Sequence, residues 1–343
     1  EKERQEKERQ EKERQEKERQ EKERQEKERQ KKIRYQEKLK QRKKKFKKRA
    51  LTIIITILMV TSGFLFGYYS SNFNFEFETE TGTITNYRGF RRDITIPGEI
   101  NGIAVRSIGH QAFQNKQLTN ITLPDSITSI ENSAFANNQL TSINLPNSLT
   151  IIGDYAFADN HLKSIILPNN INNIGVAVFR NNQLTSINIP DNIQTIQQYA
   201  FINNQIKTIT ISNSVKSIEK LAFANNQITN INLPDSILNI GASAFANNQL
   251  TSIIIPDRVT TIGDSAFRNN QLTSITLPES ITTIGDSAFK NNQLTSILIP
   301  ENVISIGKNA FIDNNISSVL ILGDKTRFNS HPWTYYGFPV WYK

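Results

Sequence analysis

The sequence contains no cysteine, which excludes disulfide bonds and thiolate chemistry. Histidine is scarce as well: His110, His161 and His331 are the only three, and none stands in an H-E-x-x-H spacing. We therefore expect no metal site and no cofactor. Serine, histidine and aspartate occur without any spacing that indicates a nucleophilic triad, so we expect the protein not to be an enzyme.

An excess of positive charge occurs in only one segment of the sequence. Residues 31–50 hold twelve Lys or Arg and one acidic residue, Glu37, whereas the net charge of the whole chain is +9. The segment is therefore more positive than the whole chain, and the rest of the chain is slightly acidic. An apolar run follows this basic block, which favours a role in membrane topology with some contact to anionic lipid. The alternative for such a block is nucleic-acid binding, which we do not expect here.

Apolar residues are absent from residues 1–30, which are six copies of EKERQ. All four residue types favour helix, and Glu3 with Lys7 forms a well-oriented i,i+4 pair. A five-residue repeat turns about 140° net per copy on a helix, so equivalent residues spiral around it and no apolar stripe forms. That argues against a coiled coil. We predict a solvated helix or a charged disordered tract; an arm that binds a partner is the alternative.

One long hydrophobic run is present. Residues 51–69 contain no charge, and the next charged residue is Glu76. As a helix these residues span about 28 Å, close to the roughly 30 Å of a hydrocarbon core. We predict a single transmembrane helix over 50–69, with the basic segment 31–49 in the cytoplasm, and a linker over 70–87. The long basic region and the missing small-residue cleavage site disfavour a signal peptide.

The remainder of the chain repeats with a period of 22 residues. Leu or Ile stands five residues after each repeated Phe, and Pro stands eleven residues after it in eight of ten copies. Such a period is typical of a solenoid, which we predict over 88–322. The phenylalanines are Phe113, Phe135, Phe157, Phe179, Phe201, Phe223, Phe245, Phe267, Phe289 and Phe311.

One repeat, LTSITLPESITTIGDSAFKNNQ over residues 272–293, shows the expected local structure. Its opening alternates apolar and polar residues, which predicts a strand with Ile275 and Leu277 facing inward. Pro278 ends that strand. Ile281 and Ile284 point inward again, and a short turn of helix through Ala288 and Phe289 follows, capped by Asp286 or Ser287.

Residues that recur at one repeat position are read as structural. We expect the phenylalanines to form one buried column, with each Phe contributing roughly 1.5–3 kcal/mol of transfer free energy. The asparagine column that begins Asn138, Asn160, Asn182, Asn204 should be a buried ladder that bonds turn backbone. Asp154, Asp264 and Asp286 read as caps or turn residues. The recurrent glycines read as turn glycines: Gly153, Gly175, Gly241, Gly263, Gly285 and Gly307.

The repeat LTSITLPxSITxIGDSAFxNNQ resembles the BspA-type leucine-rich repeats of bacterial surface proteins and some microbial eukaryotes. The resemblance covers residues 94–322, and ITIPGEINGIAVRSIGHQAF looks like the first coil, with five extra residues before Phe113. It implies a leucine-rich-repeat solenoid of 22-residue coils with a parallel β-sheet on one face. It also implies surface adhesion or binding to matrix, protein or cells, and no shared catalytic motif.

The outward positions of the predicted strands form the candidate binding face. This face is small, uncharged and nearly flat, which suits a protein or glycan bound through avidity over many copies. Solubility alone would also explain it. The candidate residues are Asn120, Thr122, Ser142, Asn144, Ser186, Asn188, Thr208, Thr210, Asn230, Asn232, Ser274 and Thr276. The neighbouring Ile166, Ile254 and Leu298 occupy the same outward positions.

Residues 323–343 are dense in aromatic side chains. Because a solenoid end exposes an apolar cross-section, we predict an aromatic C-terminal cap. The alternative is a stacking platform for sugars or wall polymer that uses Trp333, Tyr335, Tyr336 and Trp341.

Together these features predict a non-catalytic binding or adhesion module, anchored in the cell membrane by one helix, with the N-terminus cytoplasmic and the repeats extracellular. Two alternatives stay open. One is a structural spacer or coat solenoid without a specific ligand. The other is a membrane-tethered cytoplasmic scaffold, if the topology is reversed.

Overall fold

The structure is a computed structural model that describes isolated positions between Glu6 and Gln41, residues 74–323, and the backbone of residues 340–342. The chain divides into two compact units, Glu1–Ser70 and Ser71–Lys343. The described residues of the first unit are helical and almost all exposed. Side chains one turn apart contact each other there: Gln30 donates to Glu26 at 2.9 Å, and Arg29 lies 3.7 Å from Glu26.

The predicted transmembrane helix over 50–69 lies outside the described residues, as do residues 42–49 of the basic segment. Within the parts of the chain that are described, no helix combines the length and the apolar character needed to cross a membrane.

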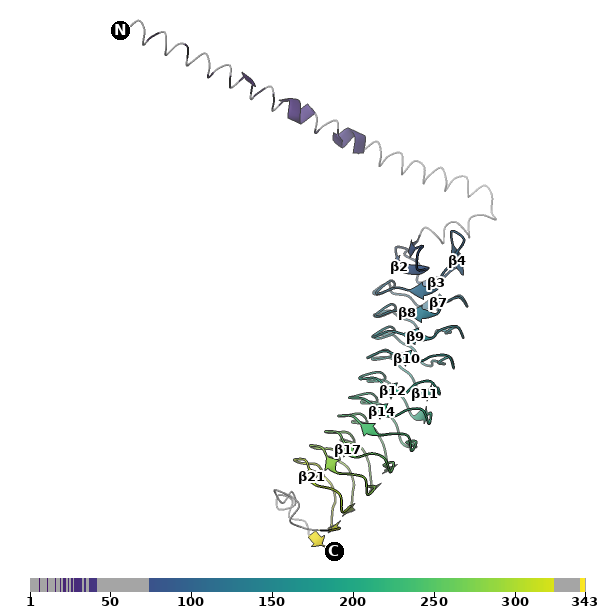
Figure 1. Ribbon diagram of the computed structural model, residues 1–343, viewed down its shortest axis with the longest axis vertical. Coiled ribbons are helices and arrows are strands. Elements are labelled where there is room, and N and C mark those ends of the chain that lie inside the picture. The colour runs from purple at the N-terminus through teal and green to yellow at the C-terminus, as the bar shows by residue number, and fades with distance from the viewer. Residues whose placement is uncertain are drawn as a thin grey trace. The chain divides into compact units, whose positions relative to one another are not determined.

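The second unit is a stack of coils, as the repeat predicts (Figure 1). The predicted strands form one side of the stack, called here the first ladder. Its neighbours pair in parallel at a spacing of one repeat, for example Ser186 with Thr208. The strands are β3 (Asp93–Thr95), β7 (Asn120–Thr122), β11 (Ser186–Ile189), β13 (Thr208–Ile211), β16 (Ser252–Ile254), β18 (Ser274–Thr276), β20 (Ser296–Ile299) and β22 (Ser318–Ile321).

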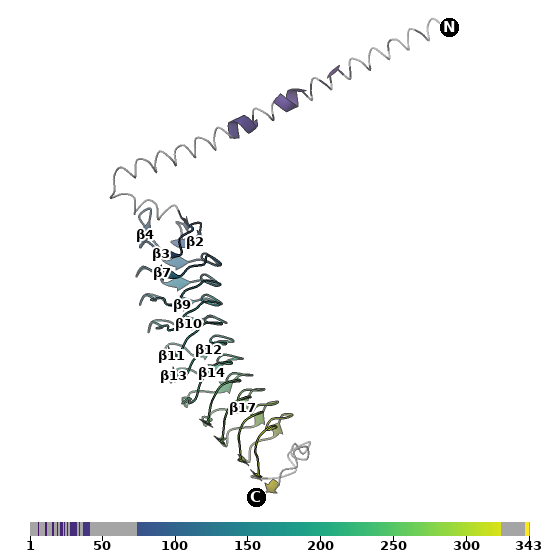
Figure 2. The same cartoon turned by 180° about the vertical axis from the view of Figure 1, so that it is seen from behind.

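The parallel strands predicted on one face are present as the first ladder. A second ladder of short parallel strands, which was not predicted, follows the other side of each coil (Figure 2). Its strands form one run of five, β2 to β10, and one of six, β12 to β21, whereas the first ladder is broken into sheets of two or three strands. Two-residue strands are too short to give a periodicity signal. The strands are β2 (Thr83–Tyr87), β6 (Ser107–Ile108), β8 (Ser129–Ile130), β9 (Ile151–Ile152), β10 (Asn173–Ile174), β12 (Thr195–Ile196), β14 (Ser217–Ile218), β15 (Asn239–Ile240), β17 (Thr261–Ile262), β19 (Thr283–Ile284) and β21 (Ser305–Ile306).

The N-terminal end of the stack is closed by a hairpin. Strand β1 (Phe75–Glu78) pairs antiparallel with β2, which in turn begins the second ladder. Ile84 and Tyr87 of β2 are fully buried in the core. The linker predicted over 70–87 is therefore wrong for residues 75–87, where the alternation of FEFETETGTITNY marks paired strands. The five extra residues of the first coil form a second hairpin, β4 (Glu99–Ile100) with β5 (Ile103–Ala104).

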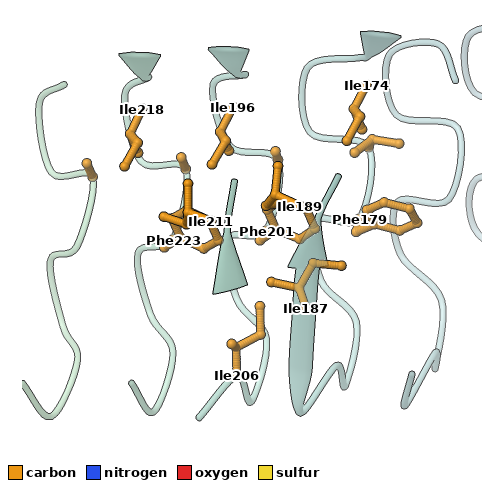
Figure 3. Packing of buried hydrophobic residues seen from close by; sticks show 14 of the residues in the cluster. Ile174, Phe179, Ile187, Ile189, Ile196, Phe201, Ile206, Ile211, Ile218 and Phe223 are labelled. Carbon is orange, nitrogen blue, oxygen red and sulfur yellow. The ribbon is translucent and has the colours of Figure 1, made fainter. Parts of the chain in front are cut away.

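The predicted phenylalanine column is confirmed. All ten rings are fully buried, and successive ring centroids from Phe113 to Phe311 lie 5.3–5.6 Å apart. Tyr87 continues the column at 5.5 Å from Phe113. Figure 3 shows Phe179, Phe201 and Phe223 between isoleucines of the two ladders. The predicted inward residues Ile281 and Ile284 are also fully buried, so one continuous core runs through all the coils.

The short helix predicted around Ala288 is wrong. Residues 286–289 form a turn in which Ser287 has a φ of 56°, in the left-handed region that a helix cannot propagate through. The backbone N–H of Ser287 donates to the carbonyl of Lys308 in the next coil at 2.9 Å. The N–H of Phe289 likewise donates to the next coil, to Ala310 at 2.8 Å, while Ala288 and Lys290 make only i→i+3 bonds within the coil, to Gly285 at 3.3 Å and Ser287 at 3.1 Å.

The recurrent glycines are needed for a reason other than the predicted one. Their φ angles are not positive, but a Cβ on Gly263 would lie 2.6 Å from the backbone nitrogen of Ala242 in the preceding coil. Close approach between coils therefore favours glycine there. Three coils carry Glu131, Gln197 or Glu219 at this position instead of glycine.

Candidate binding surfaces

The twelve candidate residues of the binding face are all exposed, as predicted. They alternate with buried residues along the first ladder: in β11, Ser186 and Asn188 are exposed while Ile187 and Ile189 are buried. The parallel register places Ser186 beside Thr208 and Asn188 beside Thr210. The outward side chains therefore form two columns of hydroxyl and amide groups along the stack.

Three apolar side chains interrupt one of these columns. Ile166 is 84% exposed, Ile254 is 73% exposed and Leu298 is 49% exposed. They are separated by polar coils, so they do not make one continuous apolar patch. A face of this kind offers a regular polar surface with isolated apolar contact points.

The buried asparagine ladder is confirmed as a structural element. The amide nitrogen of Asn182 donates to the carbonyls of Phe157 at 2.9 Å and Phe179 at 3.1 Å, and its carbonyl accepts the N–H of Leu162 at 3.0 Å. The same bonds recur along the stack. Each amide therefore satisfies backbone groups of two coils that stacking hides from water.

A second asparagine ladder was not predicted. The asparagine that precedes each buried one lies at the surface, and from Asn181 to Asn291 each amide donates to the same position of the preceding coil at 2.6–3.0 Å. The carboxylate of Asp159 accepts the first bond. These residues also have left-handed φ angles of 54–59°, which asparagine tolerates better than most residues. No sequence signal separates the two neighbouring columns, because both are asparagine.

The recurrent aspartates bond the next coil, as a turn role requires. The carboxylate of Asp154 accepts the N–H of Val176 at 2.7 Å, and that of Asp286 accepts the N–H of Lys308 at 2.7 Å. Asp264 bonds the N–H of Asp286 in the same way at 2.8 Å. These carboxylates have structural partners and do not converge on one place.

Hollows lie on the second ladder at two places in the part of the chain that the structure describes. The larger has a volume of about 600 Å³ and covers its first three strands. The smaller, about 320 Å³, lies where β10 and β12 are not paired with each other, so the second ladder is interrupted there. It is lined mainly by amide side chains, including Asn172, Asn192 and Gln197.

The shifted titratable groups belong to the N-terminal hairpin. Hydrogen bonds from Asn86, at 2.9 Å, and from Arg88 lower the pKa of the Glu76 carboxyl. Burial raises the pKa of the Tyr87 hydroxyl, which donates to the carbonyl of Arg91 at 3.2 Å. Both groups therefore make hydrogen bonds that stabilise the N-terminal hairpin and the loop that follows it. His110 and His161 are exposed, and among the described residues no group of three His, Cys, Asp or Glu is placed to hold a metal ion.

Of the aromatic tail, Trp333, Tyr335 and Tyr336 lie outside the described residues. Trp341 lies in strand β23 (Val340–Tyr342), which pairs in parallel with β22, with Leu320 opposite Trp341. The tail thus adds a strand to the first ladder beyond β22.

Comparison with known proteins identifies the repeat. A family model, the BspA type leucine rich repeat region (6 copies), matches residues 106–229 and 216–336, more than half of the chain. No curated protein sequence matches.

Solved structures with a similar arrangement are leucine-rich repeat proteins. A leucine rich cell surface protein from Faecalibacterium prausnitzii A2-165 is 22% identical, with 78% of this chain and 92% of that chain covered and a TM-score of 0.49. The pneumococcal vaccine antigen PcpA is 21% identical, with 71% and 75% covered and a TM-score of 0.44. A leucine-rich repeat protein from Eubacterium ventriosum ATCC 27560 is 22% identical, with 72% and 69% covered and a TM-score of 0.45. The resemblance read from the repeat is confirmed by the family match: the chain belongs to the family of proteins with BspA type leucine-rich repeats.

Proposed function

We propose that the chain is a non-catalytic binding or adhesion module displayed at a cell surface, and that the outward face of the first ladder contacts a protein or glycan ligand. The observation that supports this is the exposure of all twelve Ser, Thr and Asn side chains in two regular columns. Small uncharged groups make weak individual contacts. A repetitive partner that spans several coils would gain its affinity from many of them at once.

We further propose that a transmembrane helix over 50–69 anchors the module, with the charged arm in the cytoplasm and the basic segment near anionic lipid. The uncharged run of 51–69 directly after the basic block supports this orientation. Protease treatment of intact cells tests it. We expect the repeat region to be cut or released; a protected repeat region would contradict the orientation and favour a cytoplasmic scaffold.

The face itself is tested with charged substitutions. Ser186→Arg and Thr208→Arg place two long cations side by side on the first ladder, where the face is otherwise uncharged. Thr260→Arg and Thr261→Arg are the matched control, since both residues are exposed on the second-ladder side. Binding of the full chain to an array of glycans and matrix proteins is measured for each variant.

We expect the first pair to abolish binding and the control pair to leave it unchanged. Equal loss in both pairs would show that charge acts without regard to the face, and would contradict the proposal. If the folded chain bound nothing on the array, the spacer function would be favoured instead.

A further inference from the structure

The larger hollow lies at the N-terminal end of the second ladder, over strands β2, β6 and β8. The β1–β2 hairpin forms one of its walls, through Glu78 at the end of β1 and Thr81 in the loop. Gly109 also lines the hollow, at a point where the two coils lie so close that a Cβ would be 2.9 Å from the carbonyl oxygen of Ile84. A hollow of about 600 Å³ is within the size range of small-ligand sites, roughly 300–1,000 Å³.

The side chains of this hollow depart from the repeat. Where the hollow has Arg106, the next two coils have Thr128 and Thr150. Where it has Glu131, six of the later coils have glycine. The hollow therefore gathers side chains that the uniform coils do not offer, and a unique ligand needs a unique set of contacts.

Part of the lining is held in place before any ligand arrives. The carboxylate of Glu131 accepts the backbone N–H of His110 at 2.9 Å and the hydroxyl of Ser107 at 3.3 Å. Ser129 donates to the same Ser107 hydroxyl at 2.9 Å, and Ser107 is 7% exposed. These bonds join two coils and fix the carboxylate, which lowers the entropy lost on binding.

The chemistry of the lining selects one class of ligand. Two carboxylates, Glu78 and Glu131, face the hollow and disfavour an anion. Among the residues that the structure describes, no group of three His, Cys, Asp or Glu is placed to hold a metal ion, and this disfavours a metal ion here. The lining has no large apolar side chain for an apolar ligand. What it offers is a mixture of donors and acceptors: the Arg106 guanidinium, the His110 ring, the carboxylates and the hydroxyls of Thr83, Thr85, Ser107, Thr128 and Ser129.

We propose that this hollow binds a neutral saccharide unit, such as the end of a glycan chain. A sugar carries hydroxyls that both donate and accept, as this lining requires. Arg106 and the Thr hydroxyls donate to the sugar oxygens, and the free lone pairs of Glu131 accept from its hydroxyls. This inference adds a second binding site to the proposed binding function. It rests on that function only in taking the chain to be a binding protein, since no residue of the flat face lines the hollow.

The test uses the full chain in a detergent without a sugar headgroup, and a panel of neutral and acidic mono- and oligosaccharides, with affinities from titration calorimetry. The variants Arg106→Thr and Glu131→Gly replace each residue by the one its neighbouring coils carry, so they stay within the repeat pattern. Glu219→Gly makes the same change at the same repeat position far from the hollow. Circular dichroism and thermal unfolding check that each variant is folded.

We expect a neutral saccharide to bind, with Arg106→Thr and Glu131→Gly each weakening it by about tenfold or more and Glu219→Gly leaving it unchanged. Absence of binding to any neutral saccharide, or preference for an acidic one, would overturn the inference. Saccharide binding lost in Ser186→Arg but kept in Glu131→Gly would also overturn it, while leaving the proposed function of the flat face intact. The reverse pattern would support the hollow and count against the flat face.

Discussion

The buried asparagine ladder makes a quantitative prediction about stability. In a central coil, Asn226 donates to the carbonyls of Phe201 at 2.9 Å and Phe223 at 3.1 Å, and it accepts the N–H of Ile206 at 3.0 Å. Asn226→Ala removes these three bonds, and a longer one to the carbonyl of Ala224 at 3.3 Å, from a site that is 7% exposed. The carbonyls of Phe201 and Phe223 each keep a second amide donor from an adjacent coil, Asn204 or Asn248, and that of Ala224 still accepts the N–H of Asn203. The N–H of Ile206 loses its acceptor.

The cost follows from this inventory. A buried N–H without a partner costs about 1–3 kcal/mol, and each lost bond to a carbonyl that keeps another donor costs about 0.5–1.5 kcal/mol. We therefore expect Asn226→Ala to lower the free energy of unfolding by about 3 kcal/mol. The matched control is Asn225→Gly, which removes the exposed amide next to it and keeps its left-handed backbone, where φ is 57°. We expect that control to cost under about 1 kcal/mol.

Urea unfolding of the full chain, followed by circular dichroism, measures both variants. A repeat array is stabilised by neighbouring interfaces, so a weakened central coil can also split the transition into two steps. If Asn226→Ala and Asn225→Gly lowered the free energy of unfolding equally, the prediction would be wrong, because the buried amide would then contribute no more to stability than the exposed one.

Three further predictions concern the core and the stacking of coils. Phe223→Ala removes a fully buried ring stacked 5.3 Å and 5.6 Å from its neighbours, and we expect urea unfolding to show a loss of about 3–5 kcal/mol. Gly263→Ala places a Cβ 2.6 Å from backbone and should cost about 1 kcal/mol or more in thermal unfolding, whereas Gly98→Ala, with 3.9 Å of clearance, should be neutral. Gln197 follows β12 where the second ladder is interrupted, whereas the N–H of Glu219, at the same repeat position, donates to the carbonyl of Ile196 at 2.9 Å. We expect the N–H of Gln197 to exchange with deuterium about tenfold or more faster than that of Glu219. Equal exchange rates would contradict the interruption.

The sequence was sufficient for the features that the period determines. The phenylalanine column, the buried asparagines and the inward isoleucines each recur every 22 residues, and their burial follows from the need of each coil to cover its apolar side. The outward residues of the first ladder follow from the alternation of a strand. In each of these cases the residues at one repeat position have the same environment in every coil, so the repeat alone predicts whether they are buried or exposed.

The features that sequence reasoning missed depend on geometry between coils. Asn181 and Asn182 are the same residue type, and only the structure distinguishes them. The side chain of Asn181 donates to the side chain of Asp159 at the surface, whereas that of Asn182 donates to the backbone carbonyl of Phe157 in the interior. The larger hollow needs the β1–β2 hairpin, because Glu78 and Thr81 of that hairpin line it together with Arg106. Because residues 70–87 were predicted to be a linker, this wall of the hollow was not predicted.

If the stack binds its ligand along the extended face of the first ladder, affinity must depend on the length of the ligand. Glycans with one repeating unit, prepared in graded lengths, are titrated into the full chain. We expect affinity to rise steeply as the glycan spans more coils, because each added contact is intramolecular. An affinity that did not change with length, or no binding at any length by the folded chain, would contradict it.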